Sequence, residues 1–216
     1  MILLSNGGDN IERRNTASDT IVVGTVDGVA LLAKGERGWT MKHRALQGVF
    51  VSGVTALKDG TLFASTRGVG MARSDDGGFK WRWVNNGLAH HKFWSTRAGC
   101  LQGREVVLAG ALPAHLYVSE DRGESWRELP AFRNAKSASH WTFPPPPRIG
   151  HIKDIVLDGD RLWVGVEIGS LQYSDDFGKS FTELTVDPDP RECDIHRIWS
   201  IRRAKTASSS PTASSA

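Results

Sequence analysis

One short pattern occurs three times in the chain and constrains the fold more than any other feature. Each copy has a serine, an aspartate two positions later, a glycine two further on and an aromatic residue three positions after the glycine. The copies are Ser74, Asp76, Gly78 and Trp81; Ser119, Asp121, Gly123 and Trp126; and Ser174, Asp176, Gly178 and Phe181. This spacing is typical of a tight hairpin turn, because the carboxylate can accept backbone N–H groups and the glycine can adopt positive φ. The aromatic residue can fold beneath the turn, so the pattern predicts three similar β-hairpins.

The repeated pattern resembles the Asp-box, or BNR repeat, of sialidase-like β-propellers, sortilin-type receptors and photosystem assembly factors. Small bacterial-type glycosyl hydrolase BNR-repeat proteins belong to the same superfamily. In that family the box joins the third and fourth strands of each blade, on the outer rim and away from the ligand face. The resemblance implies an all-β propeller of four-stranded blades. It also implies that Asp76, Asp121 and Asp176 are structural rather than catalytic.

Turn signals between short apolar runs divide most of the chain into units of one blade each. The first unit has three expected strands and lacks an inner one, and three complete units follow. The units are 20–46, 51–88, 93–129, 151–186 and the start of another at 194–201. The box aspartates are 45 and 55 residues apart, and the longer interval contains a proline-rich insertion that we expect to be a loop. We expect residues 1–19 to be a flexible lead-in and residues 202–216 to be a disordered tail.

About four blades are present, and two ways of completing the ring are open. In the first, residues 194–201 supply the inner strand that the first unit lacks, which closes a four-bladed ring. In the second, which we favour, the chain is the front portion of a larger propeller whose reading frame is lost near Trp199. The nucleotide sequence after codon 198 distinguishes them, because the second requires further boxes in another frame.

Composition and charge exclude several classes of function. The net charge of +3 is mild and no block of Lys and Arg alternates with aromatic residues, so we expect no nucleic-acid partner. Cys100 and Cys193 lack metal-ligand spacing, and no glycine-rich phosphate loop occurs, so we expect neither metal nor cofactor. No apolar run is long enough for a signal peptide or a membrane span. The sequence therefore predicts a cytoplasmic protein without membrane association.

The residues that a sialidase needs are not visible in the chain. By resemblance, a sialidase uses a tyrosine nucleophile, an activating glutamate and three arginines, the first in an F/Y-R-I-P motif. The nearest string here is Pro147-Arg148-Ile149-Gly150, which lacks the aromatic residue and the final proline. Tyr117 and Tyr173 lie just before a box serine, near the expected rim. Neither tyrosine is placed to reach a central cleft.

Polar and aromatic residues gather where the expected inner strands begin, and such positions line the channel of a propeller. The predicted ligand-binding residues are His91, Trp94, Arg97, Trp141, Arg148 and His151, and the candidates for catalysis are Glu167, Asp194 and His196. The alternative is that these groups hydrogen-bond between blades or face solvent, which we favour. The sequence therefore predicts a non-catalytic binding or scaffold module for a protein or carbohydrate ligand. The alternative function is a sialidase-like glycoside hydrolase of the exo-α-sialidase class, or its inactive or truncated remnant.

Overall fold

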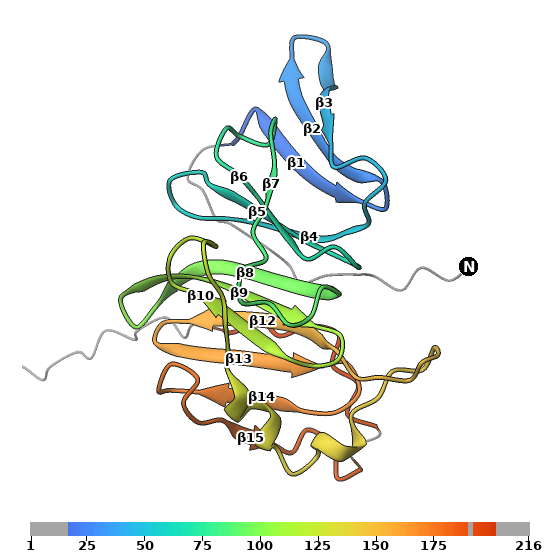
Figure 1. Ribbon diagram of the computed structural model, residues 1–216, viewed down its shortest axis with the longest axis vertical. Coiled ribbons are helices and arrows are strands. Elements are labelled where there is room, and N and C mark those ends of the chain that lie inside the picture. The colour runs from blue at the N-terminus through green and yellow to red at the C-terminus, as the bar shows by residue number, and fades with distance from the viewer. Residues whose placement is uncertain (1–16, 190–191, 202–216) are drawn as a thin grey trace, which may run out of the picture.

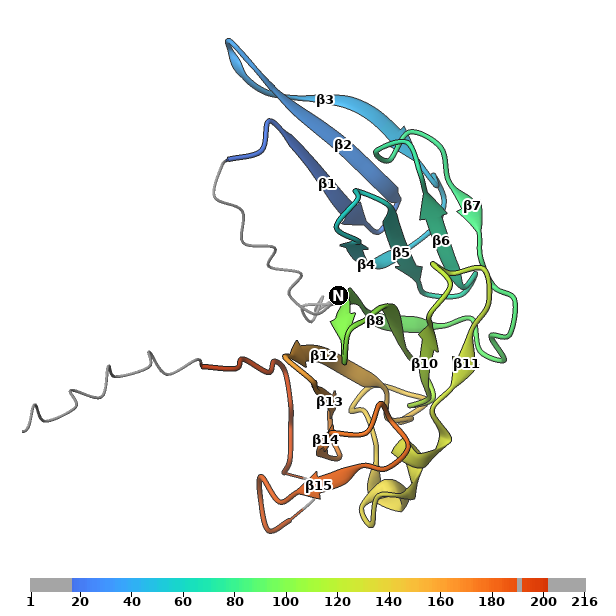
Figure 2. The same cartoon turned by 90° about the vertical axis from the view of Figure 1, so that its left-hand side faces the viewer.

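The computed structural model describes residues 17–189 and 192–201, which form four antiparallel β-sheets arranged around an arc (Figures 1 and 2). The first sheet has three strands, β1 (Thr20–Thr25), β2 (Gly28–Gly35) and β3 (Gly38–Ala45). The other sheets have four strands each, in chain order across the sheet: β4 (Val51–Ala56), β5 (Leu62–Thr66), β6 (Met71–Ser74) and β7 (Arg82–Trp83); β8 (Phe93–Leu101), β9 (Arg104–Ala111), β10 (Leu116–Ser119) and β11 (Arg127–Glu128); and β12 (Ile152–Asp158), β13 (Arg161–Val166), β14 (Leu171–Ser174) and β15 (Thr182–Leu184). The expected lead-in and tail lie largely or wholly outside the described residues.

Each sheet packs face to face on the next, as the blades of a propeller do. β8 lies against β4 and β5, and β12 lies against β8 and β9, so the inner strand of each blade contacts the first two strands of the blade before it. The buried residues form apolar clusters between neighbouring sheets. The predicted all-β propeller with four-stranded blades is confirmed.

The first blade has the second, third and fourth strands of a blade. Residues 46–50 alone lead from the end of β3 to the start of β4, so both lie at the same end of the sheets. β1 lies against β4, as β5 lies against β8, which gives β1 the second position in its blade. As expected, the described residues of the first blade include no inner strand.

Of the two open ways of completing the ring, closure by residues 194–201 is not seen among the described residues, because no residue of this segment pairs with β1. Asp194 forms a bridge with Ile168, and the Ile195 backbone N–H donates to the Glu167 carbonyl (2.6 Å), so the segment lies beside the fourth sheet. The Ile198 N–H donates to Asp154 Oδ2 (2.8 Å), which fixes the segment further along β12. Figure 2 shows that the first and fourth sheets stand at opposite ends of an open arc. The segment thus occupies the place where the inner strand of a following blade would lie.

A glycine in the second strand of three blades sets how closely the next inner strand approaches. A Cβ atom added at each glycine would overlap a β-branched side chain of that strand. The distances from the added Cβ are 2.8 Å at Gly24 to Val51 Cγ1, 2.5 Å at Gly110 to Ile152 Cγ2, and 2.7 Å at Gly165 to Ile195 Cγ2. We call these positions the glycine recesses. Ile195 fills its recess just as Val51 and Ile152 fill theirs, although no described strand continues from it into a fifth sheet.

The three copies of the pattern form turns between the third and fourth strands of blades two, three and four. In the first copy, Asp76 Oδ1 accepts the N–H groups of Phe79 (3.1 Å) and Lys80 (2.9 Å). The Ser74 hydroxyl donates to the same oxygen (3.0 Å) and accepts from the N–H of Gly78 (2.9 Å). These bonds satisfy the turn from within, which explains why the pattern needs a hydroxyl, a carboxylate and a glycine at these spacings.

The glycine of the second turn is held by packing as well as by its backbone conformation. Gly123 has φ of +85°, and a Cβ there would lie 2.7 Å from Phe63 Cε1 in the preceding blade. Gly77 has φ of +77° but nothing within 4 Å of the same position. We expect Gly77→Ala to cost about 1–2 kcal/mol for the left-handed backbone. Gly123→Ala should lower the free energy of unfolding measurably more, as urea unfolding would show, because the ring of Phe63 must also move. Equal losses of stability in the two variants would contradict this packing.

The carboxylate of the third turn should make stability depend on acid pH. Hydrogen bonds from the Ser180 hydroxyl and N–H lower the pKa of Asp176 from 3.8 to about 2. A folded-state pKa below the unfolded value gives stability that is present above pH 3.8 and lost as the pH falls towards 2. We expect Asp176→Asn to flatten the fall in Tm between neutral pH and about pH 2. Asp160→Asn, in the exposed β12–β13 turn, is the matched control and should leave that fall unchanged.

The insertion between the third and fourth blades is more structured than a loop. It contains two 3-10 turns, η1 (Pro130–Asn134) and η2 (Ala138–His140), before the exposed prolines. Phe132 in η1 is fully buried, and the ring of Trp141 packs on it with centroids 5.2 Å apart. The apolar side chains fold this part of the insertion back onto the core, so the expectation of an irregular loop holds only for the proline run.

Candidate functional site

The predicted site residues lie mainly at one end of the sheets, where the inner strands begin and the second strands end. We call this end the entry face. Adjacent strands run in opposite directions, so the three repeated turns lie at the other end of the blades. Side chains from blades two, three and four meet at the entry face, as the inter-blade contacts below show.

Three planar side chains form a stack across these blades. The guanidinium carbon of Arg67 lies 3.5 Å from the ring centroid of Trp94, and the Trp94 and His151 rings have centroids 3.8 Å apart at 33°. Phe143 meets Trp94 and His151 edge-on. Trp94 and His151 are buried, and an arginine on an indole face is a favourable cation–π pair. We call Arg67, Trp94 and His151 the entry-face stack.

The stack ends on Glu167, whose carboxylate is buried between two nitrogen groups. His151 Nε2 lies 2.7 Å and Lys153 Nζ lies 3.1 Å from Glu167 Oε2. Burial lowers the pKa of His151, which favours its neutral imidazole. Burial alone would raise the pKa of Glu167, but the hydrogen bond from His151 and the charge of Lys153 lower it. Glu167 is therefore an ionised carboxylate in a buried ion pair with Lys153.

The structure brings the three candidates for catalysis together. Ligand atoms of Glu167, Asp194 and His196 all lie within 4.8 Å of one another. Asp194 and His196 are exposed, and His196 Nε2 lies 3.2 Å from Asp194 Oδ1. Two carboxylates and an imidazole are a set that can bind divalent cations, but the ammonium of Lys153 on Glu167 opposes a second positive charge. The expectation that no metal binds stays a prediction.

The predicted ligand-binding residues do not share one environment. Trp94 and His151 belong to the stack, whereas His91 and Arg148 are exposed on the loops above it. Arg97 lies further along β8, where its Nε donates to the Ile155 carbonyl (2.9 Å) and links the third and fourth blades. Trp94, Arg97 and His151 therefore form contacts within or between blades.

Trp141 is half-buried outside the stack, where its Nε1 donates to Ser137 Oγ (2.9 Å). Its ring packs on Phe132, as described above, so the indole belongs to the folded insertion. Trp141 therefore packs on the insertion and is not part of the entry-face stack.

Sequence reasoning missed three members of this site, Arg67, Lys153 and Phe143. Arg67 and Glu167 occupy equivalent places just after the second strands β5 and β13. Aligning the blades to each other would have shown charged residues there in two blades. Lys153 also carries a signal, because it is followed by Asp154 and the two charged residues lie near the start of an inner strand.

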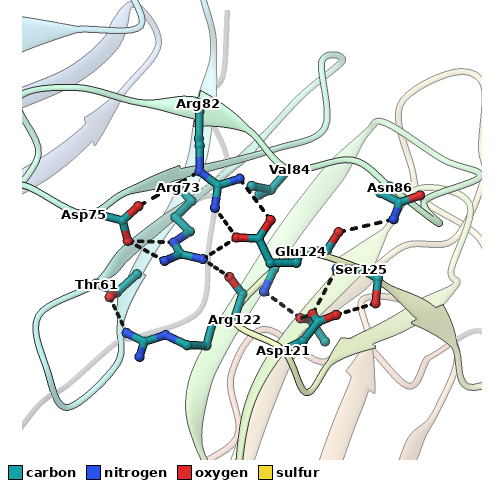
Figure 3. Close-up of polar contacts among 12 residues, drawn as sticks. Thr61, Arg73, Asp75, Arg82, Val84, Asn86, Asp121, Arg122, Glu124 and Ser125 are labelled. Carbon is teal, nitrogen blue, oxygen red and sulfur yellow. Dashed lines mark hydrogen bonds and ion pairs between the residues drawn. The ribbon is translucent and has the colours of Figure 1, made fainter.

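A second polar cluster lies between blades two and three at the opposite end of the sheets (Figure 3). It surrounds a hollow of about 680 Å³. Arg73 Nη1 donates to Glu124 Oε1 (2.9 Å) and to the Arg122 carbonyl (2.8 Å), and Arg73 Nε donates to Asp75 Oδ1 (2.7 Å). These bonds tie the second repeated turn to the preceding blade. Asp75 and Glu124 are exposed, Arg73 is half-buried, and these groups pair with each other, so we interpret the cluster as a contact between blades.

Comparison with known proteins supports the fold. No protein-family profile matches the chain, and no curated protein matches it. The extracellular domain of the hybrid two-component system BT4673 from B. thetaiotaomicron is similar in structure, with a TM-score of 0.59, 16% identity and coverage of 84% of this chain and 23% of that chain. YCF48 from Cyanidioschyzon merolae has a TM-score of 0.54, 14% identity and coverage of 78% and 54%. The chain thus spans about a quarter of the first structure and about half of the second, and the likeness shows a shared propeller fold.

The structure adds little about the compartment. No helix among the described residues combines the length and apolar character needed to cross a membrane. Cys100 is exposed, Cys193 is buried, and neither forms a disulfide. The expected cytoplasmic location stays a prediction.

Proposed function

We propose that this propeller is a non-catalytic binding module whose entry-face loops hold a segment of a partner protein. The state of Glu167 carries the proposal. A general acid in glycoside hydrolysis needs a carboxyl whose pKa is raised, so that it is protonated near neutral pH. Contacts from His151 and Lys153 lower the pKa of Glu167 instead and occupy one of its oxygens. The carboxylate therefore suits a role in fixing the blades that carry the loops.

The exposed groups around the stack favour a peptide over a sugar as the ligand. The aromatic faces of Trp94 and Phe143 are covered by Arg67, His151 and each other, so they offer no open platform for a sugar ring. The exposed residues above them are polar or aliphatic: His91, Lys92, Arg148, Ile149, Asp194 and His196. Such a surface provides hydrogen-bond donors and acceptors of both charges for a polypeptide.

We further propose that the blades belong to the Asp-box type. The repeated turns support this, because each joins the last two strands of a blade and uses its serine, aspartate and glycine in the same way. The two comparisons above show the propeller but not the box. Because propellers host many unrelated functions, the fold alone does not choose between binding and catalysis.

Selection from a phage-displayed peptide library, run beside a glycan array, tests the proposal. We expect enriched peptides whose binding weakens about tenfold or more in Arg148→Ala or His91→Ala, since both residues are exposed on the entry face. Arg37→Ala, in the exposed turn between β2 and β3, is the matched control and should bind as the parent does. Glycan binding without peptide binding would overturn the choice of ligand. Peptide binding that is equally sensitive to Arg37→Ala would overturn the choice of surface.

One observation favours a second candidate, a glycoside hydrolase. Oxygens of the Glu167 and Asp194 carboxylates lie within 4.8 Å of one another, so both can reach one ligand, as the paired carboxyl groups of a retaining glycosidase do. Turnover of fluorogenic sialosides and other aryl glycosides that is lost in Asp194→Asn would support catalysis. Asp194 is exposed, so this variant should keep its fold. Lack of turnover by the folded parent chain would remove the second candidate.

A further inference from the structure

The two ends of the arc are complementary in shape and in strand order. At one end, the first blade has its second to fourth strands, and no described strand pairs with the outer edge of β1. At the other end, residues 194–201 lie where the inner strand of a following blade would lie, with no described sheet built on them. The fourth-blade end therefore carries a segment in the position of an inner strand, and the first blade has an edge where an inner strand can pair.

The place beside β1 is a groove of the right position. A hollow of about 1170 Å³ is lined by Thr20–Val22 at the edge of β1, by Val54–Lys58 at the end of β4 and by Arg97–Cys100 at the end of β8. In the other three blades, the inner strand pairs with the second strand at this position. Ile21 and Val23 on β1 are 43% and 39% exposed, which is unusual for apolar residues in a strand next to a core. Apart from Thr20, whose N–H and C=O bond to the Ser18 hydroxyl, the backbone of such an edge can pair with an added strand.

The segment at the other end is held on one side and exposed on the other. Ile195 fills the recess at Gly165, and the Ile198 N–H binds Asp154, so the backbone is fixed against the fourth blade. Beyond these anchors, Trp199 is 52% exposed and Ile201 is 85% exposed. Large apolar side chains on a fixed, extended segment are typical of a surface that another sheet covers.

We propose that Asp194–Ile201 of a second copy of this chain pairs with the free edge of β1 and serves as the inner strand of the first blade. When both copies donate the segment, two arcs close into one ring. Backbone hydrogen bonds along β1 would provide the attachment, and the apolar side chains would set the register. This inference concerns the flanks of the arc and does not depend on the entry-face function.

The pairing of β12 with β13 predicts the register. There, Ile152 is opposite Val166, Asp154 is opposite Gly165 and Ile155 is opposite Val164. The recesses align Ile195 with Ile152 and Gly24 with Gly165. Transferred to the new pair, Ile198 of the second copy lies opposite Val23, and Trp199 of the second copy lies opposite Val22.

Cysteine cross-linking between two variants tests the register. The chain carries Cys100→Ser in all cases, because Cys100 is an exposed thiol. A mixture of Val23→Cys and Ile198→Cys chains should form a disulfide-linked dimer under mild oxidation, since directly opposed residues have Cβ atoms about 4.5–5.5 Å apart. A mixture of Val23→Cys and Trp199→Cys chains is the control and should cross-link at least several-fold less, because the period of a strand points Trp199 to the other face. Equal cross-linking in both mixtures, or none in either, would overturn the pairing.

The mass of the chain in solution tests the association itself. Sedimentation equilibrium should show the 23.6 kDa chain in a concentration-dependent equilibrium with a species of twice that mass. Trp199→Lys should raise the dimer dissociation constant about tenfold or more, as the loss of a buried aromatic anchor does. Trp39→Lys on β3, a substitution of a similarly exposed tryptophan away from the groove, should leave it unchanged. A parent chain that stays monomeric at every concentration would overturn the proposal.

Discussion

Replacing Glu167 with glutamine should lower the free energy of unfolding by about 3–5 kcal/mol, the usual cost of removing one partner of a buried ion pair. Glu167 is 2% exposed and Lys153 is 1% exposed. Without this carboxylate, the Lys153 ammonium would be buried with no counter-charge. Glutamine also cannot restore the charge-assisted contact with His151, which lies 2.7 Å away. Urea unfolding followed by tryptophan fluorescence measures the loss.

Two controls separate the ion pair from simple packing. The double variant Lys153→Met with Glu167→Leu removes both charges and should recover most of the lost stability, because buried pairs are often replaceable by apolar residues. The lowered pKa of Glu167 also fixes the sign of a pH effect: its stabilisation is present above the unfolded pKa and disappears as the pH falls through the folded one. The parent and Glu167→Gln should therefore converge in acid. A loss below about 0.5 kcal/mol at neutral pH, typical of a surface site, would contradict the account.

Gly110→Val should be the second most damaging change, with a loss at or above the upper end of the 1–3 kcal/mol that is typical of overpacking. Even a Cβ at Gly110 would lie 2.5 Å from both Ile152 Cγ2 and Ser95 Oγ, which are fixed in neighbouring strands. The third and fourth blades would have to separate to admit the side chain, so both the apolar cluster between them and the bond from Ser95 to the Ile152 carbonyl (3.0 Å) would suffer.

The matched control for this change is Gly35→Val at the exposed end of β2. The nearest neighbour of a Cβ there is the Gly38 carbonyl oxygen at 3.8 Å, so the side chain meets no obstacle. We expect Gly35→Val to change the Tm little, because valine favours extended strands. Similar losses for the two glycines would show that the recess at Gly110 does not set the distance between blades.

The local parts of the fold were predictable because their causes are local. A turn whose serine, aspartate and glycine bond to each other is specified within eight residues, so its three copies revealed the hairpins and the propeller. The missing inner strand of the first blade was also visible, since apolar runs and turn residues count strands directly.

The open arc and the entry-face stack depend instead on how the sheets are placed in space. Arg67, Trp94 and His151 come from three blades, and nothing near any one of them in the sequence indicates the other two. The position of residues 194–201 depends on whether the first blade comes round to meet them, which is set by packing between sheets. The glycine recesses that control this packing look like ordinary strand glycines until the opposing side chains are known.

The glycine recesses give three boundaries between blades the same local packing. Val51, Ile152 and Ile195 enter equivalent hollows, so a blade duplicated within the gene would find a ready seat on its neighbour without new compensating substitutions. The number of blades in such a lineage can change by whole blades at these three boundaries while the packing across each stays the same. The chain in this sense repeats one type of boundary between blades.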